Sequence, residues 1–258
     1  MERPPAIPKP AASVLILRDA PAGLEVFMVL RSPELNFSSG ALVFPGGKVD
    51  PEDADPALAV RTTGRFGEAA RAHRIAGVRE AFEETGVLLA LRADNMLAPE
   101  DAARIEARWR VAVHSGRVSF ASFLEAENLV ADTAALCHCA HWITPENSAR
   151  RFDVHFYLAA LPPSQDGSHD GSESVDSLWI RPEAALRDAA EGSRPIMFPT
   201  RAILSRLARS RNVQDALRRA AAEPVETVMT RIAATPAGRV LRIPRSAGYP
   251  MSELALDR

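Results

Sequence analysis

The sequence predicts a protein of the α/β class, of the α+β type, in which a mixed sheet is flanked by helices. Segments rich in β-branched and large apolar residues alternate with segments of helical periodicity. They do so without the steady strand–helix rhythm of a parallel doubly wound sheet. With 258 residues, 47% of them hydrophobic, the chain is also long enough to bury a large core.

Composition narrows the class of protein further. The 31 Lys and Arg residues nearly balance the 33 Asp and Glu residues, which argues against a nucleic-acid partner or a membrane surface. The N-terminus has no apolar signal core, and two cysteines, Cys137 and Cys139, fit a reducing compartment. We therefore expect a cytoplasmic protein. Because Lys9 and Lys48 are the only lysines among many arginines, we expect a GC-rich, bacterial source.

The N-terminal half predicts a hairpin, a short strand and a long helix. Residues 13–18 and 24–31 are strand-like and are joined by a Pro- and Gly-containing turn. Residues 41–44 form a short apolar strand that Pro45 and two glycines end, and 50–55 form an acidic loop. Helical spacing runs from about 67 to 85 and ends at Gly86, before a strand over 87–91.

The C-terminal half predicts a similar mixture. Residues 99–128 favour two helices, and 135–143 and 152–161 favour strands. The polar segment 162–175 predicts a mobile surface loop, followed by a strand over 177–180 and a helix from Pro182. Beyond residue 193, two helical stretches precede a hairpin across 228–243.

The residues that carry chemistry lie at the end of the first long helix. Glu80, Glu83 and Glu84 are spaced i, i+3 and i+4, so a helix places them on one face, where they repel one another. Hard oxygen ligands of this kind suit Mg²⁺ or Mn²⁺. Arg79 lies four residues before Glu83 and can pair with it. The alternative is a solvated acidic helix face.

This segment resembles the Nudix hydrolase family. The family pattern, called the Nudix box, is Gly, five residues, Glu, seven residues, then Arg-Glu-apolar-any-Glu-Glu-any-Gly-apolar. Residues 79–87 match its second half. Gly47 matches the first half, but Asp53 stands where the first Glu belongs, so Asp50, Glu52, Asp53 or none of them takes that position. An insertion of 18 residues, at about 54–71, separates the two halves.

The resemblance implies a Nudix-like α/β/α sandwich over residues 10–192 and a C-terminal helical and hairpin extension, 193–258, packed on it. It also implies metal-dependent hydrolysis of a nucleoside diphosphate derivative. Arg79, Glu80, Glu83 and Glu84 would be catalytic, and the three glutamates with the Gly47 carbonyl would bind Mg²⁺ or Mn²⁺. The expected partner is a small-molecule nucleotide, with a homodimer as an open option.

A second resemblance concerns the substrate. The residues before the box resemble the motif of coenzyme A diphosphatases, except that Asn36 replaces an Arg, and the split box resembles their peroxisomal branch. This likeness implies cleavage of CoA or acyl-CoA into 3′,5′-ADP and (acyl-)4′-phosphopantetheine. ADP-ribose, dinucleotides or nucleoside triphosphates are alternative substrates, and a non-catalytic nucleotide-binding module is a further alternative. The implied substrate-binding residues are Arg31, Ser32, Gly40, Phe44 and Gly46.

Several other residues have competing interpretations. Arg150 and Arg151 could bind a substrate phosphate or form surface ion pairs. By family likeness, Glu173 is a candidate for the base that deprotonates the attacking water; the alternative is a solvated loop carboxylate. Strand alternation predicts that Cys137, Cys139 and His141 share one face, with His138 on the other, and favours core packing over a metal site.

Overall fold

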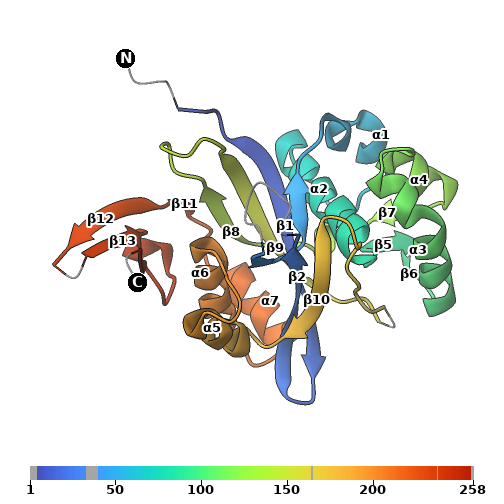
Figure 1. Cartoon of the computed structure of the whole chain (residues 1–258). Helices are drawn as coiled ribbons and strands as arrows, with labels where there is room; N and C mark the ends of the chain where they lie inside the picture. Colours follow the sequence, from blue (N-terminus) through green and yellow to red (C-terminus); the bar gives the residue numbers. More distant parts are fainter. Residues whose placement is uncertain (1–4, 33–39, 164, 237, 257–258) are drawn as a thin grey trace.

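A computed structural model describes residues 5–32, 40–163, 165–236 and 238–256. Its main feature is an eight-stranded sheet (Figure 1). The strand order along this sheet is β10 (Ser174–Ile180), β2 (Gly23–Arg31), β1 (Lys9–Ala20), β9 (Phe152–Ala160), β8 (Cys137–Ile143) and β11 (Thr227–Met229). Two short strands branch from it: β3 (Leu42–Val43) pairs with β2, and β4 (Gly46–Lys48) pairs with β1.

The sheet is mixed and has helices on both faces, which confirms the predicted α/β class. The pairs β1–β9 and β8–β11 are parallel and the other neighbours are antiparallel. One face packs against α2 (Glu68–Thr85), α3 (Pro99–His114) and α4 (Phe120–Ala126). The other packs against α5 (Pro182–Glu191), α6 (Phe198–Leu207) and α7 (Val213–Ala222) (Figure 1). None of the helices in the described ranges is long and apolar enough to cross a membrane.

Strand β1 shows how the sequence builds two cores. Its side chains alternate between the faces, and both sets are apolar: Val14 and Ile16 join the core under α2, and Leu15 and Leu17 join the core under α6. A strand covered on both sides is apolar at successive positions, as this one is. The predicted hairpin with β2 is confirmed, and its pairing extends to Ala20 and Gly23.

Two predicted elements in the first half differ from the structure. The glycines after Pro45, predicted as a stop, form β4 because their backbone pairs with β1. The acidic loop is the 3₁₀ helix η1 (Pro51–Ala54). The inserted residues continue into α1 (Pro56–Ala59), which buries Leu58, and into a bridge between Thr62 and Ala131.

Two three-stranded sheets lie outside the main one. The first has the order β6 (Asn95–Met96), β5 (Ala90–Arg92) and β7 (Val130–Ala131), followed by η2 (Thr133–Ala135). The strand predicted over 87–91 therefore starts later and lies off the main sheet. The second has the order β12 (Arg231–Thr235), β13 (Gly238–Arg242) and β14 (Glu253–Ala255), with η3 (Arg245–Ala247) between the last two.

The C-terminal part shares the core beneath α5, α6 and α7. The predicted hairpin is β12–β13, whereas residues 227–229 add the parallel edge strand β11. Tyr249 is buried against Trp142 of β8, and the indole Nε1–H donates to its hydroxyl at 3.0 Å. The boundary between 192 and 193 stays a prediction, but side chains from both sides of it pack together.

Candidate active site

Helix α2 presents two buried faces. It begins after Gly67 and ends at Gly86, whose positive φ of 74° suits a left-handed C-terminal cap; the Gly86 N–H donates to the Phe82 carbonyl at 2.9 Å. Ile75, Val78 and Phe82 are fully buried in the apolar core, where the Phe82 ring stacks on Phe123 of α4. The other face, toward β4 and η1, carries Arg79 and the three glutamates. The helix is therefore fixed by apolar packing while its polar face is also shielded from water.

Arg79 organises the carboxylates of this face. Its Nε and Nη2 donate to the two oxygens of Asp53, each at 2.9 Å, and its Nη2 also donates to the Lys48 carbonyl. Its Nη1 donates to Glu80 at 2.9 Å and to Glu83 at 3.3 Å. Such a planar, bidentate fork fixes geometry as well as charge. Burial alone would lower the pKa of Arg79, but the bonds to Asp53 and the nearby glutamates raise it, so the guanidinium stays charged.

Asp53, one of the candidates for the first box glutamate, is the buried partner of Arg79. Its side chain is only 1% exposed and makes the bidentate pair with Arg79. It also accepts the Asp50 N–H at 2.8 Å, which closes the first turn of η1. Asp50 itself lies 3.5 Å from Arg79 and is 57% exposed, and Glu52 is exposed. Burial and pairing favour Asp53 over Asp50 and Glu52, and its assignment to the first box position stays a prediction.

The backbone of β4 lies directly against the glutamates. The Gly46 N–H donates to Glu84 Oε2 at 2.9 Å. A Cβ added at Gly47 would lie 2.3 Å from Glu80 Oε1, and one added at Gly46 would lie 2.3 Å from the Ala12 carbonyl oxygen. Gly46, with φ of +154°, requires glycine because a side chain would collide with backbone, whereas a side chain at Gly47 would displace the Glu80 carboxylate.

The electrostatics of this face fit a hard divalent cation. Burial raises the pKa of Glu80 to about 7, and it also raises the pKa of Glu83 and, strongly, that of Glu84. The cause is the lost hydration of the ionised form, and the neighbouring carboxylates add to it. Three oxygen donors that need positive charge, beside a glycine carbonyl that can approach closely, are a suitable ligand set for Mg²⁺ or Mn²⁺.

Three residues predicted to bind substrate or to act as the base, Arg31, Ser32 and Glu173, come together on the neighbouring strands β2 and β10, near Glu84. Strands β2 and β10 pair Arg31 with Ser174, and the Ser32 N–H donates to the Glu173 carbonyl at 2.9 Å. The charges of Arg31 and Glu173 both shift the pKa of Glu84, Arg31 downward and Glu173 upward, so both lie within electrostatic reach of it. The Arg31 Nε is buried without a hydrogen-bond partner among the described residues, and it can donate to an anion.

The remaining residues of the predicted CoA motif have structural roles. Gly40, with φ of +67°, donates its N–H to the Arg31 carbonyl at 3.2 Å. Phe44 is buried in the core and packs edge-on against Phe156 with 6.5 Å between the ring centroids. Asn36 lies outside the described residues. Contact of Gly40 or Phe44 with substrate stays a prediction.

The structure separates the two arginines before β9. Arg150 is exposed. Arg151 is buried, and its Nε and Nη1 donate to the carbonyls of Thr144 and Ala6 at 3.0 and 2.8 Å. This fork holds the N-terminal segment against the turn between β8 and β9. A phosphate-binding role for either arginine stays a prediction.

Sequence reasoning missed two residues of α3 that face the box. The Arg110 Nε donates to the Glu83 carbonyl at 3.0 Å, and its Nη2 donates to the Ser168 carbonyl at 2.7 Å. His114 lies 4.0 Å from Glu83 and 3.7 Å from Asp170. Their i, i+4 spacing on one helix face was the available signal. They connect the box helix to the polar loop.

The polar loop, predicted as mobile, is attached at several points. The side chain of Gln165 both accepts the Leu88 N–H and donates to the Leu88 carbonyl. Asp170 is only 5% exposed at its side chain and accepts the N–H groups of Glu173 and Ser174 at 2.9 and 3.0 Å. These bonds fix the backbone that carries Glu173.

A cleft of about 370 Å³ opens beside this site. Arg79, Asp53 and Glu83 line one side, and the turn between α3 and α4 lines the other. Most of the titratable groups in its wall are carboxylates. An anionic phosphate would therefore be repelled unless cations offset that charge.

Comparison with known proteins identifies the family. The sequence profile of the NUDT19 Nudix domain matches residues 60–207, more than half of the chain. The chain belongs to the Nudix family. It is 31% identical over 226 residues to the acyl-coenzyme A diphosphatase NUDT19 of Homo sapiens, covering 70% of this chain and 57% of that protein. It is 25% identical over 207 residues to the Xenopus laevis protein of that name, covering 64% of this chain and 54% of the relative.

A solved structure supports the same assignment. A Nudix hydrolase from Alicyclobacillus acidocaldarius superposes with a TM-score of 0.67 at 26% identity, covering 85% of this chain and 99% of that one. Both the predicted Nudix-like sandwich and the resemblance to the Nudix family and its CoA diphosphatase branch are therefore confirmed. The chain spans little more than half the length of the curated relatives described above. Because those relatives are eukaryotic, they do not support the expected bacterial source.

Proposed function

We propose that this Nudix hydrolase cleaves the pyrophosphate bond of CoA or acyl-CoA and releases 3′,5′-ADP and (acyl-)4′-phosphopantetheine. The observation that carries the hydrolytic part is the buried group of Glu80, Glu83 and Glu84 against the β4 backbone. The substrate class is supported by the NUDT19 relatives and by Arg31, whose buried Nε is available to a phosphate.

The three glutamates and the Gly47 carbonyl would hold Mg²⁺ or Mn²⁺, as members of the Nudix family generally use divalent metals. Such an ion, when bound, neutralises the pyrophosphate and lowers the pKa of a bound water. Arg79 keeps Glu80 and Glu83 oriented in the absence of substrate, because it is itself fixed by Asp53.

The reaction needs a base as well as a ligand set. Water adds to one phosphorus, the bond from that phosphorus to the bridging oxygen breaks, and the proton of the water must be accepted. We assign that proton to the Glu173 carboxylate, which lies on a backbone fixed by Asp170 and within electrostatic reach of Glu84. Arg31 would bind a phosphate of the nucleotide through a charge-assisted hydrogen bond.

The experiment is a substrate screen with separated products. Purified protein with Mg²⁺ or Mn²⁺ is offered CoA, acetyl-CoA, ADP-ribose, NADH and nucleoside triphosphates. We expect CoA and acetyl-CoA to be cleaved fastest, with 3′,5′-ADP as the common product. Preferred turnover of ADP-ribose, NADH or a triphosphate would reject the CoA assignment, and nucleotide binding without turnover would favour a binding module.

A further inference from the structure

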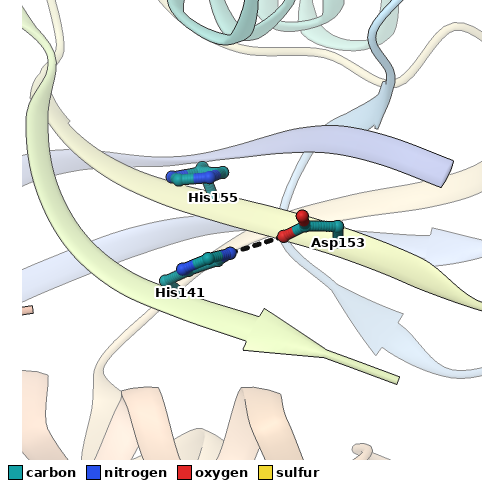
Figure 2. A group of neighbouring side chains, drawn as sticks. All are labelled: His141, Asp153 and His155. Carbon is teal, nitrogen blue, oxygen red and sulfur yellow. Dashed lines mark hydrogen bonds and ion pairs between the residues drawn. The ribbon is translucent and has the colours of Figure 1, made fainter. Parts of the chain in front are cut away.

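A second cluster of ligand-type side chains lies on the sheet, separate from the glutamates of the box. His141 of β8 and His155 of β9 are direct cross-strand partners, and their rings stack with 4.0 Å between centroids. Asp153, two residues before His155, hydrogen-bonds to the His141 Nε2–H. Figure 2 shows the three side chains gathered on the same side of these strands.

A β-bulge enlarges this cluster. Pairing shifts between His138 and Ala140, so Cys139 and Ala140 both lie on the face opposite the cluster, beside Phe156. The bulge therefore brings His138 onto the face of His141, which corrects the prediction that they lie on opposite faces. The His138 ring lies 4.9 Å from that of His155, and Nε2 of His138 is 3.0 Å from Nδ1 of His155.

Helix α2 adds a fourth histidine. The His73 ring lies 4.4 Å from the His155 ring, centroid to centroid. Its Nδ1 is 2.8 Å from the Ala69 carbonyl, so this nitrogen carries the proton and Nε2 carries the lone pair. That Nε2 is buried without a hydrogen-bond partner in the part of the chain that the structure describes. A buried nitrogen lone pair without a partner is costly unless something binds there.

We propose that His141, Asp153 and His155 bind a divalent transition-metal ion of the Zn²⁺ type, at a site distinct from the Nudix box. One ligand atom from each residue lies within 4.8 Å of the other two. Small side-chain rotations are enough to bring these atoms to the roughly 2.0–2.2 Å from Zn²⁺ that imidazole and carboxylate ligands adopt. The ion takes the place of the proton on His141 Nε2 beside Asp153, and the ring carries its proton on Nδ1 instead, next to the Thr227 hydroxyl.

The donor types select the class of ion. Two imidazoles and one carboxylate suit Zn²⁺ and its neighbours, whereas Mg²⁺ prefers oxygen ligands alone. The Asp153 side chain is 35% exposed, which leaves a path for an ion to enter.

Outer hydrogen bonds already orient both rings. His141 Nδ1 lies 2.8 Å from Thr227 Oγ1 of β11, so Nδ1–H can donate to the hydroxyl once Nε2 binds the ion beside Asp153. When Nδ1–H of His155 donates to Nε2 of His138, 3.0 Å away, the lone pair of His155 lies on Nε2 and is left for the ion. Such partners fix the tautomer and ring direction in metal sites. The ion would tie β8 to β9 directly and would hold β11 through Thr227.

The test is a Zn²⁺ titration of the full chain by calorimetry, with millimolar Mg²⁺ present to occupy the carboxylate site. We expect one equivalent of Zn²⁺ to bind the parent protein. His155→Asn and Asp153→Asn should each weaken this binding by at least about tenfold, since even outer partners of a metal site contribute that much. The matched control is His169→Asn, a histidine outside the cluster that should bind Zn²⁺ as the parent does.

A second measurement uses the parent protein alone, so it does not require that a variant folds. Co²⁺ added to the parent protein should give visible absorption of a nitrogen-ligated, low-coordinate ion, and Zn²⁺ should displace it. Zn²⁺ should also raise the Tm of the parent more than that of His155→Asn. Zn²⁺ binding that Mg²⁺ abolishes, or that is equal in the parent, His155→Asn and Asp153→Asn, would overturn the proposal. Absence of stoichiometric Zn²⁺ binding by the parent would overturn it as well.

Discussion

Helix α2 contributes to two clusters of opposite chemistry, one near each end. Glu83 lies ten residues after His73, about 15 Å along the axis at 1.5 Å per residue. The glutamate cluster holds like charges that Arg79, itself fixed by Asp53, partly neutralises. The histidine cluster consists mostly of imidazoles around a single carboxylate. The difference teaches that donor type, more than proximity, decides which ion each end of the helix can bind.

The largest effect should come from the glutamate cluster. Glu83→Gln and Glu84→Gln keep side-chain size but remove a charge that a hard cation needs, so each should lower kcat by about 10²–10³, the scale of losing one electrostatic stabiliser. Removing a repulsive charge should leave the metal-free Tm unchanged or higher. Steady-state kinetics on CoA and thermal melting test both outcomes. The matched control is Glu68→Gln, an exposed change in the first turn of the same helix.

Near-parent kcat at saturating Mg²⁺ in either variant would contradict the ligand role. The glutamate cluster would then not be the site that binds the hard cation, and the contrast between the two clusters would be wrong. Turnover lost together with a lowered Tm would indicate damage to the fold instead.

The next effect concerns the carboxylate that fixes Arg79. Asp53→Asn removes one partner of a buried, bidentate ion pair, which should cost about 3 kcal/mol of the free energy of unfolding. Urea denaturation measures this cost. Glu52→Gln, an exposed neighbour in the same 3₁₀ helix, should change it by less than about 0.5 kcal/mol. Equal losses of unfolding free energy in Asp53→Asn and Glu52→Gln would show that the ion pair of Asp53 with Arg79 does not stabilise the fold.

A smaller effect is expected at the phosphate contact. Arg31→Ala should raise the KM for CoA by about 10- to 100-fold, since a hydrogen bond to a charged group contributes roughly 1.5–3 kcal/mol. Arg150→Ala should also raise KM, but less, because Arg150 is exposed and screened. Kinetics on CoA and dephospho-CoA measure these changes. If either variant keeps the KM of the parent on both substrates, the arginine that it lacks does not bind substrate.

The smallest effect should arise in the polar loop. Burial would raise the pKa of Asp170, but hydrogen bonds from Ser172, Glu173 and Ser174 outweigh it and lower that pKa. Asp170→Asn should therefore cost about 1 kcal/mol at pH 7. A lowered pKa gives stability that is complete above the unfolded value of 3.8 and is lost as pH falls through the folded value. The difference in Tm between the parent and Asp170→Asn should thus vanish in acid. A difference that stays constant with pH would contradict the stabilising role of the ionised Asp170.

The two clusters also differ in how far the sequence predicts them. The glutamates repeat at i, i+3 and i+4 within one helix that ends at Gly86, so local periodicity was enough to place them on one face. The fold class followed similarly from the β1–β2 hairpin and from α2.

The histidine cluster was not predictable in this way. It combines β8, β9 and α2, and it depends on a bulge at Cys139 that shifts the side-chain alternation of β8. Without that bulge, His138 and His141 would point to opposite faces. Arg110 and His114 were missed for a related reason, because nothing in the sequence shows which element lies over the end of α2.

The central claim, that Glu80, Glu83 and Glu84 form the centre that binds the catalytic cation, is tested most directly by Mn²⁺ binding. Free Mn²⁺ is followed by electron paramagnetic resonance while protein is added. The parent, His155→Asn and Glu68→Gln should bind Mn²⁺ alike and release it to Mg²⁺, whereas Glu83→Gln and Glu84→Gln should bind it at least about tenfold more weakly. Mn²⁺ binding that is unchanged in the Glu83 and Glu84 variants, or that is lost in His155→Asn, would contradict the account.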